Sequence, residues 1–175
     1  MPYHSSGHSM CAVSIGVSGL VSLRQNGVAD LPQDVCCHCL VTLANGDLFY
    51  SGGYSGATVK TSYRYVKQED RWDQKANMVG ARRVHGCGSV TNPATGKEEV
   101  VVTGGGGNGG HLSSTEIYNV EDDTWRQGTP LPKALNGPTS LPYEDSFLIL
   151  GGYDGSCLDS IYQVETPKSF YLRVW

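Results

Sequence analysis

Pairs of adjacent glycines recur along this chain, and each pair closes a short apolar run. The pairs begin at Gly52, Gly104 and Gly151, which places them 52 and then 47 residues apart. The apolar runs that precede them span residues 48–50, 100–102 and 147–150. Self-similarity at a period of about 50 residues predicts an array in which one supersecondary unit is repeated.

Aromatic residues follow each glycine pair in register. They are Tyr65 and Trp72, Tyr118 and Trp125, and Tyr162 and Phe170. The first two couples are separated by seven residues and the third by eight, with Phe170 standing where Trp is expected. Upstream of the glycine pairs, Asn136 is aligned with His38 and His85. Several matched positions in each unit make the repeat a stronger signal than any single glycine pair.

Each unit is predicted to contain four short strands. The first strand spans residues 38–43, 84–91 or 137–142 in the three units, and the second is the apolar run before the glycine pair. The third strand spans 62–66, 115–120 or 160–164, and the fourth begins at Trp72, Trp125 or Phe170. Alternating, β-branched and aromatic residues favour strands in these segments. Glycine accounts for 23 of 175 residues, about twice its usual share. Because glycine is costly inside helices and useful in turns, we expect essentially no helix.

This unit resembles the kelch repeat, whose Gly-Gly, Tyr and Trp positions recur in the blades of a β-propeller. The resemblance covers residues 34–172. The family's marker positions fall on Gly52, Gly53, Tyr65, Trp72, Gly104, Gly105, Tyr118, Trp125, Gly151, Gly152 and Tyr162. It implies structural roles for them, since glycines allow close backbone approach and the aromatic rings fill the space between blades. We therefore expect an all-β fold, a partial kelch-type β-propeller of three four-stranded antiparallel blades.

The repeat divides the chain into four parts. They are an N-terminal segment over 1–33, blade 1 over 34–80, blade 2 over 81–133, and blade 3 over 134–175 with an incomplete or degenerate fourth strand. The N-terminal segment is either irregular or, at 21–30, a remnant strand of a preceding blade with Gln25 at the Trp position. Propellers typically have 4–8 blades, so three leave the ring incomplete. We expect the remaining blades to come from sequence missing here, as in a fragment, or from another copy.

Composition restricts the partners and the compartment. The net charge is −4 and no basic cluster is longer than Arg82-Arg83, which argues against nucleic acid as a partner. No apolar stretch has the length of a membrane span. Residues 11–23 resemble a weak signal-peptide core, but no Lys or Arg precedes them. We expect a cytoplasmic location, with secretion as the alternative, and free, mostly buried thiols at the six cysteines.

Two motifs suggest chemistry that the rest of the sequence does not support. Gly104, Gly106 and Gly109 formally match a dinucleotide-binding fingerprint, but the helix that this motif needs is not expected after them. Cys36 and Cys39 form a C-x-x-C, but no second Cys/His pair follows at zinc-site spacing. We therefore expect no catalytic residues, no bound cofactor and no metal.

In a propeller, the loops after the glycine pairs lie on the same face as the loops between blades. Here these loops are residues 54–60, 107–114 and 153–159, with 79–84 and 131–136 between blades. Their tips carry Tyr54, Arg82, Arg83, Asn108, His111, Lys133, Tyr153 and Asp154. Aromatic and Arg side chains on such loops suit recognition of a protein or peptide.

These observations together lead to two functional hypotheses. The first is a non-catalytic protein–protein interaction module of the kelch type, serving as a substrate-recognition or scaffold domain. The alternative is an extracellular propeller. An activity like that of the copper radical oxidases would require a neighbouring domain that these residues do not include.

Overall fold

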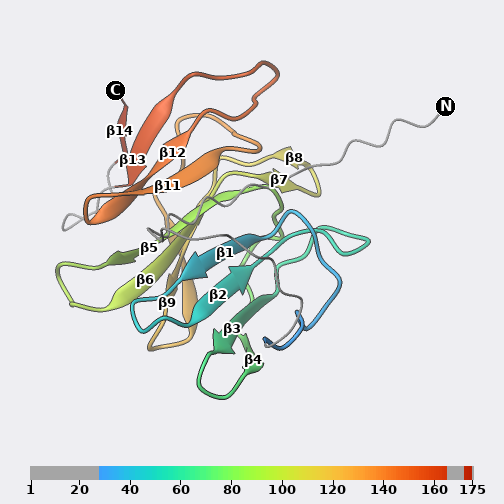
Figure 1. Cartoon of the computed structure of the whole chain (residues 1–175). Helices are drawn as coiled ribbons and strands as arrows, with labels where there is room; N and C mark the ends of the chain where they lie inside the picture. Colours follow the sequence, from blue (N-terminus) through green and yellow to red (C-terminus); the bar gives the residue numbers. More distant parts are fainter. Residues whose placement is uncertain (1–27, 165–171, 175) are drawn as a thin grey trace, which may run out of the picture.

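The computed structural model describes residues 28–164 and 172–174, and these residues form strands and turns without a helix (Figure 1). The absence of helix in this part of the chain confirms the all-β prediction. The expectations for 1–27, which include the segment 11–23 and Gln25, lie outside the described residues, and so does Phe170.

Three antiparallel sheets of four strands follow one another along the chain, and we call them blades 1, 2 and 3. Blade 1 contains β1 (Cys39–Thr42), β2 (Leu48–Ser51), β3 (Ser62–Val66) and β4 (Arg71–Lys75) in that spatial order. Blade 2 contains β5 (Gly86–Thr91), β6 (Glu98–Thr103), β9 (Thr115–Asn119) and β10 (Thr124–Gly128). Blade 3 contains β11 (Thr139–Tyr143), β12 (Ser146–Leu150), β13 (Ile161–Val164) and β14 (Leu172–Val174). In Figure 1 blade 3 lies at the top, blade 2 in the middle and blade 1 below.

The strand register corrects two details of the repeat alignment in blade 3. Tyr65 pairs with Trp72 and Tyr118 with Trp125, whereas the residue opposite Tyr162 is Val174. The Trp position of blade 3 is therefore occupied by Val174 and not by Phe170. Cys39, Gly86 and Thr139 each pair with the residue just before a glycine pair. The counterpart of His38 and His85 is consequently Pro138, two residues beyond Asn136.

The glycine pairs form the joints between neighbouring blades. Gly104 and Gly105 have φ of +66° and +94°, a left-handed backbone that favours glycine. A Cβ on Gly104 would lie 2.6 Å from the carbonyl oxygen of Leu135, which belongs to the loop leading into blade 3. The N–H of Gly105 donates to the same carbonyl oxygen. The recurring pairs are thus required by close backbone contact between blades.

A clamp of three side chains holds each of the first two blades to the segment that precedes it. In blade 2, Asp123 accepts hydrogen bonds from the hydroxyl of Tyr118 (2.7 Å) and the N–H of Ala76 (2.8 Å), while Trp125 donates to the carbonyl of Ala76 (2.8 Å). Ala76 directly follows the last strand of blade 1. The clamp therefore ties the outer edges of blades 1 and 2 together.

Blade 1 makes the same clamp on Ala29. Asp70 accepts hydrogen bonds from Tyr65 (2.6 Å) and from the N–H of Ala29 (2.7 Å), and Trp72 donates to the Ala29 carbonyl (3.1 Å). Ala29 thus occupies, relative to blade 1, the place that Ala76 occupies relative to blade 2.

Two hydrophobic cores lie between the blades. Between blades 1 and 2, the ring of Phe49 stacks on Tyr118 with centroids 4.5 Å apart, beside Val41 and Val100. Between blades 2 and 3, Ile117 and Val101 are buried in one cluster with Phe147 and Ile149. Each such buried side chain contributes roughly 1.5–3 kcal/mol to stability.

A disulfide joins Cys39 of β1 to Cys87 of β5, with the two Cα atoms 6.3 Å apart. The expectation of free, mostly buried thiols is therefore wrong. Among the free cysteines of residues 28–164, Cys36 and Cys157 are exposed and Cys37 is half-buried. Cys39 and Cys87 do not occupy matching positions in their blades, so the repeat pattern gave no reason to pair them.

Candidate functional site

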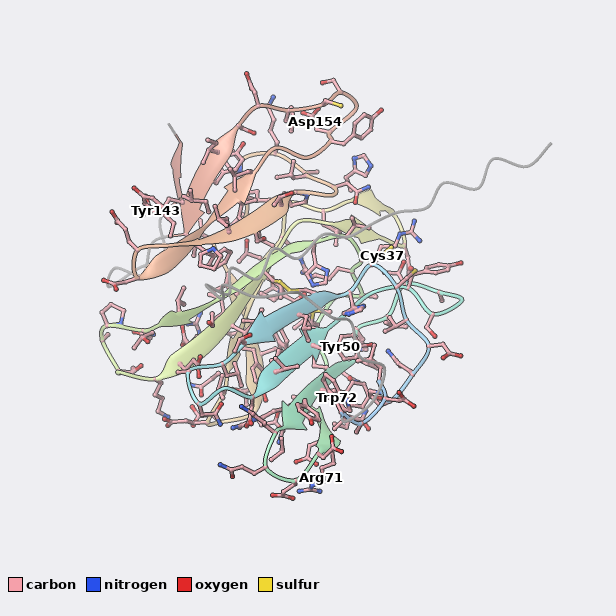
Figure 2. All side chains as sticks on the ribbon, in the orientation of Figure 1. Cys37, Tyr50, Arg71, Trp72, Tyr143 and Asp154 are labelled. Atoms are coloured by element: carbon pink, nitrogen blue, oxygen red, sulfur yellow. A yellow bond between two sulfur atoms is a disulfide. The ribbon has the colours of Figure 1, made fainter. Side chains whose placement is uncertain are left out.

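The loops that follow the glycine pairs gather on one side of the molecule, which we call the loop face. Its frame is a set of backbone bridges between each of these loops and a segment leading into a blade: Cys36 with Tyr54, Arg83 with Gly106, and Asn136 with Tyr153. The hydrogen bonds of these bridges measure 2.8–3.0 Å. Figure 2 shows Cys37 and Asp154 toward this side and Arg71 at the opposite end of the molecule.

Arg83 and Tyr54 form the first side-chain contact of the loop face. The guanidinium carbon of Arg83 lies 5.2 Å from the centroid of the Tyr54 ring, which is within cation–π range. Gly106 occupies the position of Tyr54 and Tyr153 in the other blades. It has no side chain, and the side chain of Arg83 lies next to it. Arg83 therefore bridges blades 1 and 2 on an accessible surface.

A second group of contacts crosses from blade 2 to blade 3. The rings of His111 and Tyr153 meet edge to face with centroids 5.8 Å apart. Lys133 lies 3.8 Å from Asp154, a weak surface ion pair. Asn108 is exposed in the turn between β7 (Gly106–Gly107) and β8 (Gly110–His111), a two-stranded hairpin within the segment that was expected to be a loop.

Arg82 does not belong to this surface, and its expected position at an exposed loop tip is wrong. Its side chain is 0% exposed and forms an ion pair of 2.6 Å with Glu116, which is 1% exposed. It also donates to the carbonyl oxygens of Gly104 and Ser114. Glu116 in turn accepts from the N–H groups of Val79 and Gly80. Arg82 is thus a structural residue that fixes the loop between blades 1 and 2.

Other polar residues of the loop face were not among the expected site residues. Cys36 is exposed beside Tyr54, and Cys157 is exposed and bridges Tyr153. Asn136 has a buried side-chain oxygen without a hydrogen-bond partner in the described part of the chain. These residues could not be assigned to the loop face from the sequence alone, because the sequence does not reveal which segments pair with the loops at Tyr54 and Tyr153.

A buried serine–histidine pair lies beneath the glycine pair of blade 1. Ser51 Oγ and His85 Nε2 are 3.5 Å apart, and both residues are buried. Burial, followed by the charge of Arg82, lowers the pKa of His85 to about 3. A neutral imidazole with so low a pKa is a poor general base, and a buried hydroxyl cannot meet a substrate. The pair is therefore not arranged for nucleophilic catalysis.

The described residues contain neither a metal-binding group nor a membrane-spanning helix. Over 28–164 and 172–174, no three His, Cys, Asp or Glu side chains gather as a metal-binding group. Gly106 and Gly110, from the glycine-rich stretch, form strand pairs rather than a turn into a helix. The same residues contain no helix long and apolar enough to cross a membrane.

Comparisons with known proteins agree with this geometry. The family model described as Kelch motif matches residues 91–132. Kelch repeat and BTB domain-containing protein 8 of Danio rerio is 29% identical over 141 residues, which are 73% of this chain and 22% of that protein. Kelch-like protein 23 of Mus musculus is 32% identical over 120 residues, 66% of this chain and 20% of that protein. The repeats of this chain are kelch repeats.

The fold comparison supports the same architecture. A solved structure titled "Structure of YjhT" matches with a TM-score of 0.71 at 14% identity, covering 85% of this chain and 48% of that one. At this identity the likeness concerns the kelch propeller fold alone. The chain spans about a fifth of the length of the curated kelch relatives that it matches.

Proposed function

We propose that this kelch chain is a non-catalytic protein-interaction module that recognises a protein or peptide partner through its loop face. The observation that carries the proposal is the pair of contacts Arg83–Tyr54 and His111–Tyr153, which place aromatic rings and a cation on one accessible surface. Aromatic and Arg side chains are the ones that most often dominate binding energy at protein interfaces. A role in substrate recognition or as a scaffold would use this surface.

The backbone bridges beneath the loop face reduce the cost of binding. Because Tyr54, Gly106 and Tyr153 are already fixed by hydrogen bonds to the segments beside them, little backbone order has to be gained when a partner docks. Among the described residues no carboxylate forms an ion pair with Arg83. Its guanidinium is therefore available to a carboxylate or carbonyl of the partner.

The proposal is tested with matched arginine and tyrosine variants. Peptides selected on the folded chain from a random display library are measured for affinity by titration calorimetry. Arg83→Ala and Tyr153→Ala are expected to weaken binding at least about tenfold, as hot-spot truncations do. The control Arg71→Ala removes an exposed arginine at the opposite end of blade 1 and is expected to change affinity less than about twofold. Equal losses for Arg71→Ala and Arg83→Ala would reject the loop face as the binding surface.

A secreted kelch module is the second candidate, and the Cys39–Cys87 disulfide favours it. Disulfides persist in oxidising compartments and are rare in the cytosol. Alkylation of free thiols in the cell, followed by mass spectrometry of the isolated chain, separates the two locations. Alkylated Cys39 and Cys87 support the cytoplasmic module, and a peptide linked through both supports the secreted one.

A further inference from the structure

The turn of the β7–β8 hairpin is an Asn-Gly pair, Asn108-Gly109, on the loop face (Figure 1). Both residues are exposed. A Cβ added to Gly109 or to Gly110 would meet no other atom within 4 Å, so nothing in the described part of the chain packs against these positions. The ladder between β7 and β8 has two residue pairs. Segments with so few contacts open at a low cost in free energy.

An Asn-Gly pair can rearrange without an enzyme. The backbone nitrogen of the glycine attacks Cγ of the asparagine side chain, the Cγ–Nδ2 bond breaks, and Nδ2 leaves as ammonia with the proton of the glycine N–H. Water then opens the cyclic imide at either carbonyl. One opening gives aspartate, and the other gives isoaspartate, whose backbone runs through the side chain. Glycine favours the ring closure because it has no side chain to hinder its nitrogen and its backbone turns readily.

This reaction needs two groups that are free to meet, the glycine N–H and the asparagine side-chain amide. Among the described residues, the N–H of Gly109 and the side chain of Asn108 form no hydrogen bond. Both reacting groups are therefore exposed to solvent, without a partner that holds them apart.

The pair Asn45-Gly46 has the same sequence but is held by hydrogen bonds. Nδ2 of Asn45 donates to the carboxylate of Asp47 (2.8 Å), and its side-chain oxygen accepts from the N–H of Asp47 (3.0 Å). The N–H of Gly46 donates to the carbonyl of Leu43 (2.8 Å). The side chain and the attacking nitrogen are thus both engaged in the turn between β1 and β2.

The pair Asn136-Gly137 is held between blades. The N–H of Gly137 donates to the carbonyl of Val84 (2.9 Å), and the N–H of Asn136 donates to the carbonyl of Tyr153 (2.9 Å). The side-chain oxygen of Asn136 is buried. A fourth pair, Asn26-Gly27, lies outside the described residues. Of the three described pairs, the fold therefore leaves one free to react.

We propose that Asn108 is a site of spontaneous deamidation, which adds a negative charge to the loop face of the folded chain. The new carboxylate lies in the same hairpin as His111, whose ring meets that of Tyr153 with centroids 5.8 Å apart. Isoaspartate also inserts the side-chain methylene into the backbone of the turn. The covalent change needs no partner and is independent of the proposed function, whereas its effect on binding rests on that function.

Peptide mapping of the whole chain by tandem mass spectrometry tests the proposal after incubation in mildly alkaline buffer. Asn108 is expected to deamidate at least about tenfold faster than Asn45 or Asn136, whose hydrogen bonds must first open. In urea the three sites are expected to react within about threefold of one another, because unfolding removes the bonds that distinguish them. Asn108→Asp supplies the chromatographic reference that separates aspartate from isoaspartate.

Gly109→Ala tests the attacking nitrogen. A Cβ fits there without contact and the φ of Gly109 is not positive, so circular dichroism and the unfolding midpoint should stay unchanged. The added side chain is expected to slow deamidation at Asn108 at least about tenfold, while Asn45 and Asn136, as internal controls, keep their rates. Equal rates at the three sites of the folded chain, a difference that persists in urea, or a rate at Asn108 that ignores Gly109→Ala would each overturn the proposal.

Discussion

At the scale of single residues, Arg82 and Arg83 are neighbours with opposite environments. Arg82 is enclosed by Glu116 and the carbonyls of Gly104 and Ser114, whereas Arg83 lies over the ring of Tyr54 on the loop face. Breaking a buried ion pair leaves an uncompensated charge, which costs about 3–5 kcal/mol. A change at a partly exposed residue usually costs less than about 0.5 kcal/mol.

This contrast gives the first prediction. Arg82→Met is expected to lower the free energy of unfolding by about 3–5 kcal/mol, because Glu116 loses its counter-charge inside the protein. Arg83→Met, the matched control, is expected to leave it within about 0.5 kcal/mol of wild type. Urea unfolding of both variants decides the matter. Comparable losses at the two positions would show that Arg82 is not the structural arginine of the pair.

The buried imidazole of His85 gives a prediction about pH. Burial lowers its pKa from 6.5 to about 3, so the unfolded chain takes up a proton that the folded chain refuses. The resulting stability is complete above pH 6.5 and falls as the pH drops toward 3, by up to about 1.4 kcal/mol per unit. His85→Gln is expected to unfold with a shallower loss between pH 6.5 and 5, measured by urea titration at each pH. Carboxylates contribute alike to both proteins, and equal slopes would contradict the assignment.

At the scale of elements, the clamps of Tyr, Asp and Trp have different consequences in the two blades. Trp125 donates a hydrogen bond to Ala76 and so connects blade 2 to blade 1, whereas Trp72 donates one to Ala29 in the segment that leads into blade 1. The same hydrogen bond therefore supports a joint between blades in one case and a peripheral segment in the other.

A pair of conservative variants measures this difference. Trp125→Phe keeps an aromatic ring but removes the bond to the Ala76 carbonyl, and it is expected to cost about 1–2 kcal/mol of global stability. Trp72→Phe, the control, is expected to change global stability by less than half as much. Hydrogen exchange of the Ala29 amide should instead become faster in Trp72→Phe. If Trp72→Phe lowers the unfolding midpoint as much as Trp125→Phe does, the clamps are equivalent and this account of them is wrong.

Much of the element scale could be predicted from the sequence. The first three strands of every unit and the fourth strands of blades 1 and 2 were predicted correctly, because glycine pairs, alternation and aromatic spacing all follow from contacts repeated in each blade. The fourth strand of blade 3 was expected to open at Phe170, whereas β14 spans Leu172–Val174. The burial of Arg82 was not predicted, because the sequence alignment of blade 3 was displaced by two residues and aligned Lys133 with Arg82. In the observed register its counterparts are Val35 and Leu135, and two apolar residues at that position would have indicated burial.

The loop face was predictable only in outline. The sequence indicated which loops share a side, but the contacts Arg83–Tyr54 and His111–Tyr153 depend on how neighbouring blades are rotated against each other. The Cys39–Cys87 disulfide depends on the same rotation, because it joins non-equivalent positions of β1 and β5. Such contacts between repeats have no periodic signal in the chain.

At the scale of the whole molecule, the disulfide fastens blades that otherwise meet through side-chain packing and hydrogen bonds. It closes a loop with a sequence separation of 48 residues, for which chain entropy predicts a stabilisation of about 4 kcal/mol, with about 2–4 observed for typical bridges. Reduction is therefore expected to lower the free energy of unfolding by about 2–4 kcal/mol. In the Cys39→Ser/Cys87→Ser variant the reductant should have no further effect. Wild-type stability that is insensitive to reductant would contradict a bridge between the blades.

The repeated residues hold the blades together, and we propose that the loop face binds the partner. Hydrogen–deuterium exchange of the chain with and without a selected peptide tests it directly. Added protection is expected in the loops 54–60, 107–114 and 153–159, with none in the turns 67–70 and 92–97 at the other end of the blades. Protection confined to those turns, or spread evenly over both ends, would contradict the account.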